Sequence, residues 1–182
     1  VPPKTLRANT LVNSRDELIG SFTVEGLEVK ATRFSPSGIE VLNGKPKAKD
    51  RRYYIQDEAS QLIAHLVGPE PGEHVLDACS APGGKTTHMA ELMRNKGVIC
   101  GLDAYPNRLK SVEESASRLG INIIKTIAAR SEVPLPIGLD GFDAVLLDAP
   151  CTGLGVVRRA PEMKYRREER EIKEMSAKQA RL

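Results

Sequence analysis

Cysteines, long apolar runs and net charge are all scarce in this chain of 182 residues. The three cysteines, Cys79, Cys100 and Cys151, are odd in number and lack the spacing of metal ligands, which argues against a disulfide scaffold and a metal site. No stretch approaches the roughly 20 apolar residues of a membrane span, and the N-terminus lacks the apolar core of a signal peptide. We therefore expect a cytoplasmic monomer with no membrane or metal partner.

The net charge of +3 does not by itself indicate a nucleic-acid-binding protein. The basic residues are nevertheless grouped, with one group between residues 45 and 52 and another between residues 158 and 167. Without further observations, such groups indicate a solvated surface.

Residues 1–50 are expected to form a small α+β unit with a basic linker. Ser14 and Glu17 have the spacing of a capping box at a helix start, and Gly26 suits the end of that helix. Alternating runs on both sides of the helix predict strands.

Residues 51–182 show alternating helix and strand patterns. Four runs are continuously apolar, as in a parallel sheet covered on both faces: residues 73–79, 98–103, 121–128 and 142–150. One of the helices between them is expected to close at Gly97. The pattern predicts an α/β, doubly wound, Rossmann-like sheet. We expect this sheet to be incomplete, because only four strands are present and the last helix has no stop signal.

Polar motifs follow three of these strands, at the edge where ligands bind in doubly wound folds. The turn from Cys79 to Lys85 follows the first strand, Asp103 ends the second, and Asp148 to Cys151 end the fourth. Their convergence is the strongest functional signal in the sequence.

The sequence Gly84-Lys85-Thr86 is the tail of a phosphate-binding P-loop. Two residues oppose this interpretation. Cys79 stands where the first glycine of the P-loop is required, and Pro82 lacks an N–H donor. The spacing of the dinucleotide-binding fingerprint is absent as well.

S-adenosylmethionine is the third candidate ligand. Its sulfonium and amino groups are cationic, so its site needs less positive charge than a phosphate site. Its ribose needs an acid at the end of the second strand, and Asp103 is placed for that role. A helix cap ahead of Pro106 is the alternative role of Asp103.

Four motifs in this order resemble the Nop/Sun family of RNA cytosine-5 methyltransferases: QDEASQL, DACSAPGGKT, GLDAYPNRL and LLDAPCTGLGVVRRAPEMK. The pattern is similar to that of the bacterial Sun-type enzymes, which methylate small-subunit ribosomal RNA. The resemblance runs from about Lys4 to the end of the chain. It implies that residues 1–50 bind RNA and that residues 51–182 are the N-terminal part of a methyltransferase domain.

The resemblance implies S-adenosylmethionine as cofactor, ribosomal RNA as partner, and methyl transfer to C5 of a cytosine. It implies cofactor binding by Cys79, Ser80, Ala81, Pro82, Gly83, Gly84, Lys85, Asp103, Arg108 and Asp148. It implies catalytic roles for Cys151, Asp148 and Lys85. The basic groups then become candidates for RNA contacts, in particular Arg52, Arg158 and Arg159.

The chemistry agrees with these roles. Cytosine C5 becomes nucleophilic only when a thiolate adds to C6 while an acid stabilises N3 and the exocyclic amine. A thiol with a pKa near ~8.5 is mostly protonated, so it needs an electropositive site. Asp148 beside Cys151 supplies an acid and a thiol at one strand end. Lys85 could lower the thiol pKa or orient the base.

Two features depart from the family pattern. The attacking cysteine of the RNA enzymes lies in a Thr-Cys pair on a later strand, whereas the Pro-Cys cysteine helps to release the product. This chain has no Thr-Cys pair, so we expect a fragment that ends before the attacking cysteine and is inactive alone. In addition, Ala128-Ala129-Arg130 stands where the family has an acid that contacts the adenine.

Aromatic residues form only 4% of the chain, so few side chains can stack on RNA bases. Tyr53, Tyr54 and Tyr165 are the candidates, and packing within the protein is an equal alternative for each. Two other functions stay open, a P-loop nucleotidase and a catalytically inactive RNA-binding module.

Overall fold

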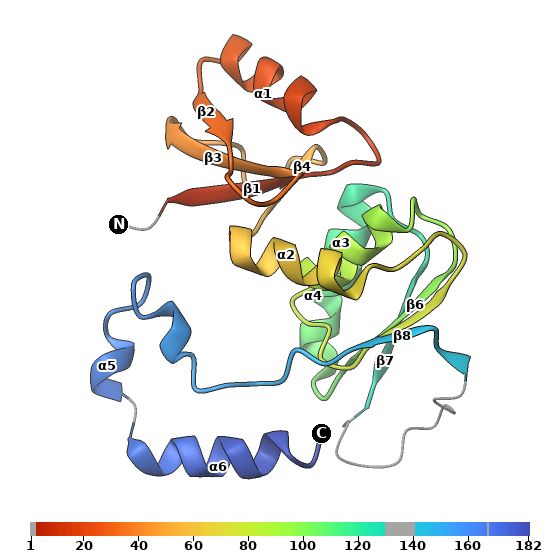
Figure 1. Cartoon of the computed structure of the whole chain (residues 1–182), viewed down its shortest axis with the longest axis vertical. Helices are drawn as coiled ribbons and strands as arrows, with labels where there is room; N and C mark the ends of the chain where they lie inside the picture. The colour runs from red at the N-terminus through yellow and green to blue at the C-terminus, as the bar shows by residue number, and fades with distance from the viewer. Residues whose placement is uncertain (1–2, 130–140, 167) are drawn as a thin grey trace.

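Strands in the described part of the chain form two four-stranded sheets that lie one above the other in Figure 1. The computed structural model describes residues 3–129, 141–166 and 168–182. Within them, no helix is both long and apolar enough to cross a membrane.

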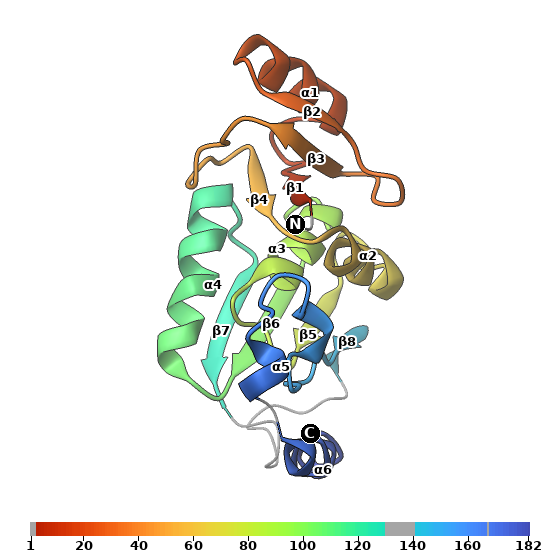
Figure 2. The same ribbon diagram turned by 90° about the vertical axis from the view of Figure 1, so that its left-hand side faces the viewer.

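The first sheet is antiparallel and has the order β2-β3-β1-β4. Its elements are β1 (Lys4–Ala8), α1 (Arg15–Val24), β2 (Glu28–Ala31), β3 (Gly38–Asn43) and β4 (Tyr53–Ile55). Figure 2 shows α1 on the outer side of this sheet, where Leu18 and Phe22 pack on Leu6 and Ile39. We call these elements the small unit.

The start of α1 is built as its sequence predicts. The Ser14 side chain accepts a hydrogen bond from the Glu17 backbone N–H, and the Glu17 side chain accepts one from the Ser14 N–H. The capping box is therefore confirmed. β4 lies beyond residue 50, where the sequence places the second domain, yet it pairs with β1 and forms one edge of the first sheet.

The second sheet is parallel with the order β7-β6-β5-β8, as in one half of a Rossmann-like sheet. Its strands are β5 (His74–Asp77), β6 (Val98–Asp103), β7 (Ile124–Ala128) and β8 (Ala144–Leu146). Helices α2 (Glu58–Val67), α3 (Gly84–Leu92) and α4 (Pro106–Leu119) accompany them. The predicted α/β class is confirmed.

Among the described residues, α2, α3 and α4 all pack on the same face of the parallel sheet, which differs from the expected cover on both faces. The shared core includes Ala64, Met89 and Leu119. The other face carries Leu76, Cys100 and Leu102. Cys100 is buried among apolar neighbours, as its apolar strand predicts.

Helix α3 ends at Leu92, and the predicted end at Gly97 is wrong. Arg94 and Asn95 adopt left-handed conformations, with φ of 52° and 56°. The N–H of Asn95 donates to the carbonyl of Ala90 at 2.9 Å, which closes the helix early. Asparagine tolerates this conformation better than most residues do.

After β8 the chain leads away from the sheet through the 3-10 turn η2 (Leu154–Val156), α5 (Met163–Arg166) and α6 (Glu169–Gln179) (Figure 1). The helix expected over the last 16 residues is thus observed over Glu169–Gln179.

A buried arginine joins the small unit to the second sheet. Arg7 of β1 is 0% exposed, and its Nε and Nη2 donate to the two carboxylate oxygens of Glu91 on α3 at 3.0 and 2.7 Å. Its Nη1 donates to Gln56 Oε1 at 2.6 Å and to the Gly84 carbonyl at 2.5 Å. This side chain therefore holds α3 at both its first turn and its last turn.

We expect Arg7→Met and Glu91→Leu each to lower the free energy of unfolding by about 3–5 kcal/mol, because each leaves a buried charge without its counterion. The double variant should lose less than either single variant, since neither charge remains. Urea denaturation followed by circular dichroism measures all three. Additive losses would contradict a coupled ion pair.

Candidate functional site

The three predicted motifs meet at the carboxyl edge of the parallel sheet. They surround a cavity of about 250 Å³, slightly smaller than the ~300–1,000 Å³ usual for small-molecule sites. We call it the first cavity. Its walls include Cys79, Ala81, Asp103, Arg108, Asp148 and Cys151.

The turn between β5 and α3 is fixed largely by main-chain contacts. Both the N–H and the Oγ of Ser80 donate to the Leu102 carbonyl, at 2.7 and 3.0 Å, which pins the turn to β6. The Ala81–Pro82 peptide bond is cis. Gly83 has a φ of 105°, and a Cβ there would lie 3.1 Å from Val112 Cα. Ser80 and Gly83 thus shape the turn, and their contact with a cofactor stays a prediction.

Asp103 faces the first cavity from the end of β6. Its Oδ1 accepts the N–H of Tyr105 at 2.9 Å, and its Oδ2 lies 3.1 Å from Nη1 of Arg108. Arg108 also donates to the Ala81 carbonyl at 3.0 Å, so it connects the two strand ends. The N-cap residue of α4 is Tyr105, so the alternative of Asp103 as the cap of this helix is wrong.

A second hollow of about 210 Å³ lies beside the first cavity and shares Cys79, Ala81 and Asp148 with it. Lys85 lines this second hollow, and its ammonium forms an ion pair with the Asp148 carboxylate. Tyr54 also lines this second hollow. The side chain of Asp148 is thereby held where the two spaces meet.

Cys151 is exposed and lines the first cavity together with Asp148. The preceding carbonyl, that of Pro150, accepts a hydrogen bond from Gln179 of α6 at 2.8 Å. The structure therefore gathers Lys85, Asp148 and Cys151 around the same strand ends.

Asp77 begins the DACSAPGGKT motif and lines the second hollow, but it was not among the predicted site residues. It ends β5 beneath the turn, where its carboxylate accepts hydrogen bonds from Thr86 Oγ1 at 2.7 Å and from the Cys79 N–H at 3.3 Å. Burial raises the pKa of Asp77 to about 6. The available signal was an acid ending an apolar run directly before the turn.

Arg52 is bound within the small unit. Its guanidinium contacts Glu25 at 2.5 Å and Asp50 at 2.7 Å, and these two carboxylates raise its pKa. Its carbon Cζ lies 5.5 Å from the centre of the Phe22 ring. Its predicted contact with RNA remains a prediction.

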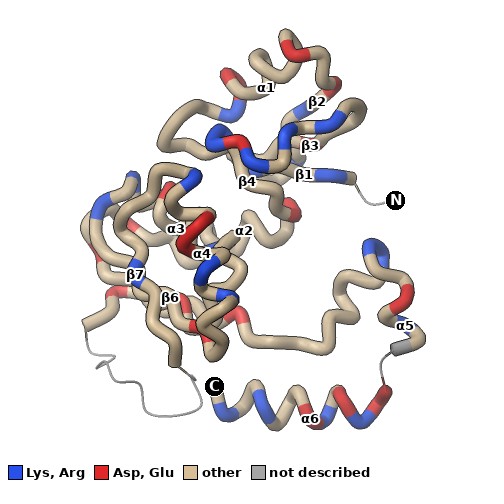
Figure 3. The backbone as a smooth tube through the Cα atoms, turned by 180° about the vertical axis from the view of Figure 1, so that it is seen from behind, with Lys and Arg blue, Asp and Glu red and all other residues tan. Residues whose placement is uncertain are grey.

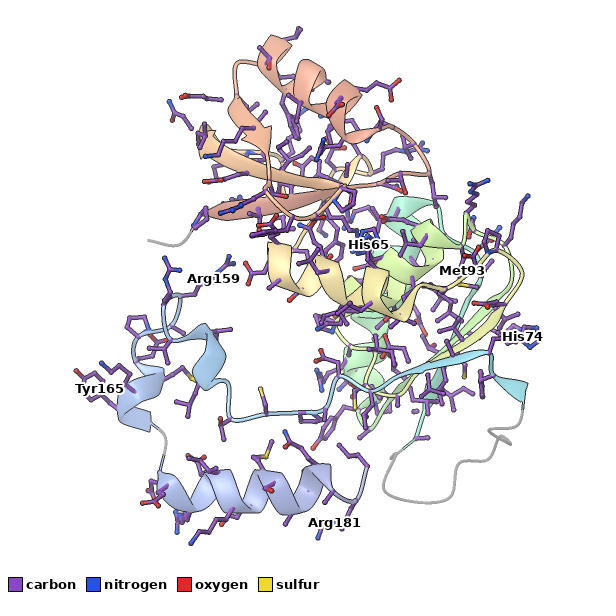
Figure 4. All side chains as sticks on the ribbon, viewed as in Figure 1. His65, His74, Met93, Arg159, Tyr165 and Arg181 are labelled. Atoms are coloured by element: carbon purple, nitrogen blue, oxygen red, sulfur yellow. The ribbon has the colours of Figure 1, made fainter. Side chains whose placement is uncertain are left out.

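The second basic group lies after the Pro-Cys loop. Arg158 is exposed, and Arg159 pairs with Asp57 at the start of α2 and donates to the Pro3 carbonyl at 3.2 Å. Figure 4 shows Arg159 on the side of its loop that faces α2. Figure 3 shows basic positions along this loop and along the connection between β3 and β4.

The three tyrosine candidates for base stacking have different surroundings. Tyr53 is 1% exposed and packs edge-on against Phe22, so the stacking interpretation is wrong for this residue. The Tyr54 ring has the guanidinium of Arg7 at 5.2 Å. Tyr165 is 89% exposed and points outward in Figure 4.

Ala128-Ala129-Arg130, the segment predicted to depart from the family pattern, begins at the end of β7. Ala128 ends this strand, and the N–H of Ala129 donates to the Asp103 carbonyl at 3.2 Å. Arg130 lies outside the described residues. Among those that are described, no three His, Cys, Asp or Glu side chains are grouped to hold a metal ion.

The raised pKa of Asp77 makes stability depend on pH. The folded state keeps this proton up to a pH of about 6, whereas the unfolded chain releases it near ~3.9. The stabilisation from Asp77 is therefore complete below a pH of about 4 and is lost as the pH rises through about 6.

We expect Asp77→Asn to become more stable relative to wild type by up to about 2–3 kcal/mol as the pH rises from roughly 4 to 7. Urea denaturation across this range measures the difference. Asp16→Asn, whose carboxylate is 82% exposed, is the control. A difference that does not change with pH would contradict the assignment.

Comparisons with known proteins agree with this arrangement. Residues 64–182 match the family model described as 16S rRNA methyltransferase RsmB/F. A probable ribosomal RNA small subunit methyltransferase B of Bacillus subtilis is 42% identical over 172 residues, which cover 91% of this chain and 38% of that protein. A human 28S rRNA (cytosine(4447)-C(5))-methyltransferase is 38% identical over 178 residues, covering 93% of this chain and 22% of that protein.

A solved structure has a fold similar to that of this chain. The crystal structure of PH0851 has a TM-score of 0.92 and 36% identity, and the match covers 98% of this chain and 42% of that chain. The chain thus spans about two-fifths or less of the length of these relatives. With the family model matched over residues 64–182, the chain belongs to the 16S rRNA methyltransferase RsmB/F family.

Proposed function

We propose that this chain is the cofactor-binding part of an S-adenosylmethionine-dependent methyltransferase that acts on C5 of a cytosine in ribosomal RNA. The observation that carries the proposal is the pair of adjoining spaces with Asp148 in the wall of both. One would hold the cofactor and the other the target base. Contact of the small unit with RNA, a cytoplasmic location and a monomeric state stay predictions.

The first cavity has acids at two strand ends, which suit the ribose hydroxyls and the cationic groups of S-adenosylmethionine. These acids are Asp103 and Asp148, which pair with Arg108 and Lys85, and Lys178 is a further wall residue. Carboxylates beside a polyphosphate would repel it. When bound, S-adenosylmethionine supplies an electrophilic methyl group. The Asp103 carboxylate would accept hydrogen bonds from its ribose hydroxyls.

The second hollow offers the groups that a cytosine requires. The exocyclic amine of cytosine is a hydrogen-bond donor. Asp148, oriented by the Lys85 ammonium, would accept from it. Cys151 lines the adjoining first cavity together with Asp148 and would remove the C5 proton. The C5–H electrons then restore the C5–C6 double bond and expel the sulfur that had added to C6.

We propose that the attacking thiolate is supplied by a Thr-Cys segment that is absent from these 182 residues. Turnover is therefore measured in a full-length protein that carries this chain together with such a segment. The relatives methylate ribosomal RNA according to their names, and this supports the choice of RNA as substrate.

Asp103→Ala is expected to weaken S-adenosylmethionine binding at least about 100-fold, because two hydrogen bonds to a charged acceptor contribute roughly 1.5–3 kcal/mol each. Isothermal titration calorimetry of the full-length protein measures the affinity. Glu114→Ala removes an exposed acid of α4 and serves as the control. Tight binding of magnesium-ATP without binding of S-adenosylmethionine would instead support a P-loop nucleotidase.

Cys151→Ala in the full-length protein is expected to accumulate a covalent protein–RNA adduct, since methylated product then leaves the attacking sulfur too slowly. Denaturing gel electrophoresis with labelled ribosomal RNA detects the adduct. Cys100→Ala, which removes a thiol from the sheet core, should form none. Normal turnover by the Cys151 variant would exclude Cys151 as the group that releases the product. If the wild type neither binds nor methylates RNA, the proposed methyltransferase activity is excluded.

A further inference from the structure

The turn between β2 and β3 presents an aromatic side chain to solvent. Phe34 is 63% exposed, although the chain has only three phenylalanines and four tyrosines. The guanidinium carbon of Arg33 lies 5.0 Å from the centre of the Phe34 ring. This distance is within the range of a cation–π contact, so the two side chains form one aromatic, positively charged feature. We call it the Arg33–Phe34 platform.

The backbone beneath the platform is held firmly. The N–H groups of Phe34 and Ser35 both donate to Oε1 of Glu58 on α2, at 2.5 and 3.0 Å. The Ser35 hydroxyl donates to Gln61 Oε1 at 2.6 Å. At Gly38, a Cβ would lie 2.1 Å from Thr32 Oγ1, so this tight turn requires glycine. Such preorganisation lowers the entropic cost of binding through Phe34.

The platform stands beside a groove that adjoins the proposed base site. This groove measures about 480 Å³, and its walls include Thr32, Glu58, Ser60, Arg158 and Arg159. Ser60 also lines the second hollow, where Lys85 and Asp148 meet. The groove, whose wall includes Thr32 next to Arg33, therefore adjoins the hollow assigned to the target base at Ser60.

Acidic side chains in the groove are already bound by positive partners or donors. Arg159 pairs with Asp57, and Lys30 lies 3.3 Å from Glu40. Glu58 accepts the two backbone N–H groups of the platform turn. Arg158 is exposed in the groove wall, and Arg33 belongs to the neighbouring platform, so these two cations offset the remaining charge of Glu58 and permit an anionic polymer.

We propose that the Arg33–Phe34 platform binds an unpaired base of the RNA strand that flanks the target cytosine, a role that rests on the proposed function. The Phe34 ring stacks on the base, and the Arg33 guanidinium holds the ring and faces the strand. Every base has a π-face, so the contact favours single-stranded RNA without selecting its sequence.

The test uses the full-length protein and a fluorescein-labelled oligocytidylate, with affinity measured by fluorescence anisotropy. Phe34→Ala is expected to weaken binding by about 5- to 150-fold, the effect of losing one base–aromatic stack. Phe34→Trp should keep the affinity. This chain has no tryptophan of its own, so quenching of the added indole fluorescence by RNA would report stacking directly.

Two controls separate stacking from other effects. Val24→Ala removes an exposed apolar side chain, 91% accessible, from the far side of the small unit and should bind RNA as wild type does. The salt dependence of Phe34→Ala should match that of wild type, because a stack releases no counterion. Titration with S-adenosylmethionine should give the wild-type affinity for Phe34→Ala.

Unchanged RNA affinity in Phe34→Ala, or no quenching in Phe34→Trp, would contradict base stacking on the platform. Such a result would favour a protein partner for this surface. Such a result leaves the proposed function standing if wild type still binds S-adenosylmethionine and methylates RNA. Failure of the wild type to bind either ligand would remove both proposals together.

Discussion

The contact of Arg7 with Glu91 is the constraint on which the arrangement of the site depends. Removing a guanidinium from water is costly, and here both carboxylate oxygens, a side-chain amide and a main-chain carbonyl satisfy it. The planar fork of arginine can reach these acceptors together, whereas the single ammonium of lysine cannot. Because one acceptor is the carbonyl of Gly84, the small unit directly supports the helix turn from which Lys85 projects.

The ion pair of Lys85 with Asp148 affects which ligands the glycine turn can bind. A lysine that follows two glycines at a helix start is suited to a phosphate, but here its ammonium is bound to the Asp148 carboxylate, just beyond the end of β8. Asp103, anchored by Arg108, adds a second acid at the same sheet edge. The acids that face this turn from the ends of β6 and β8 therefore distinguish it from a phosphate-binding loop, although both have Gly-Lys-Thr at a helix start.

Much of the fold was predictable because its signals are local. The capping box at Ser14 and the apolar strands of the parallel sheet depend on residues close together in sequence. The end of α3 was not, because a left-handed Asn95 replaced the expected glycine stop. Within the site, motif spacing predicted Asp103 and Asp148. Motif spacing assigned no role to Asp77 or Arg7, because their roles depend on burial and on partners in other elements.

Chain order has a consequence for synthesis. Arg7 and Glu91 are separated by 84 positions, and at a ribosomal rate of about 5–20 residues per second the ribosome needs roughly 4–17 s to add that length. During this interval the strands of the small unit emerge while the guanidinium still lacks its carboxylate. Water or a transient acceptor must solvate that charge until α3 is made. Completion of the interface between the two sheets is therefore a late event, and it follows the synthesis of the turn between β5 and α3.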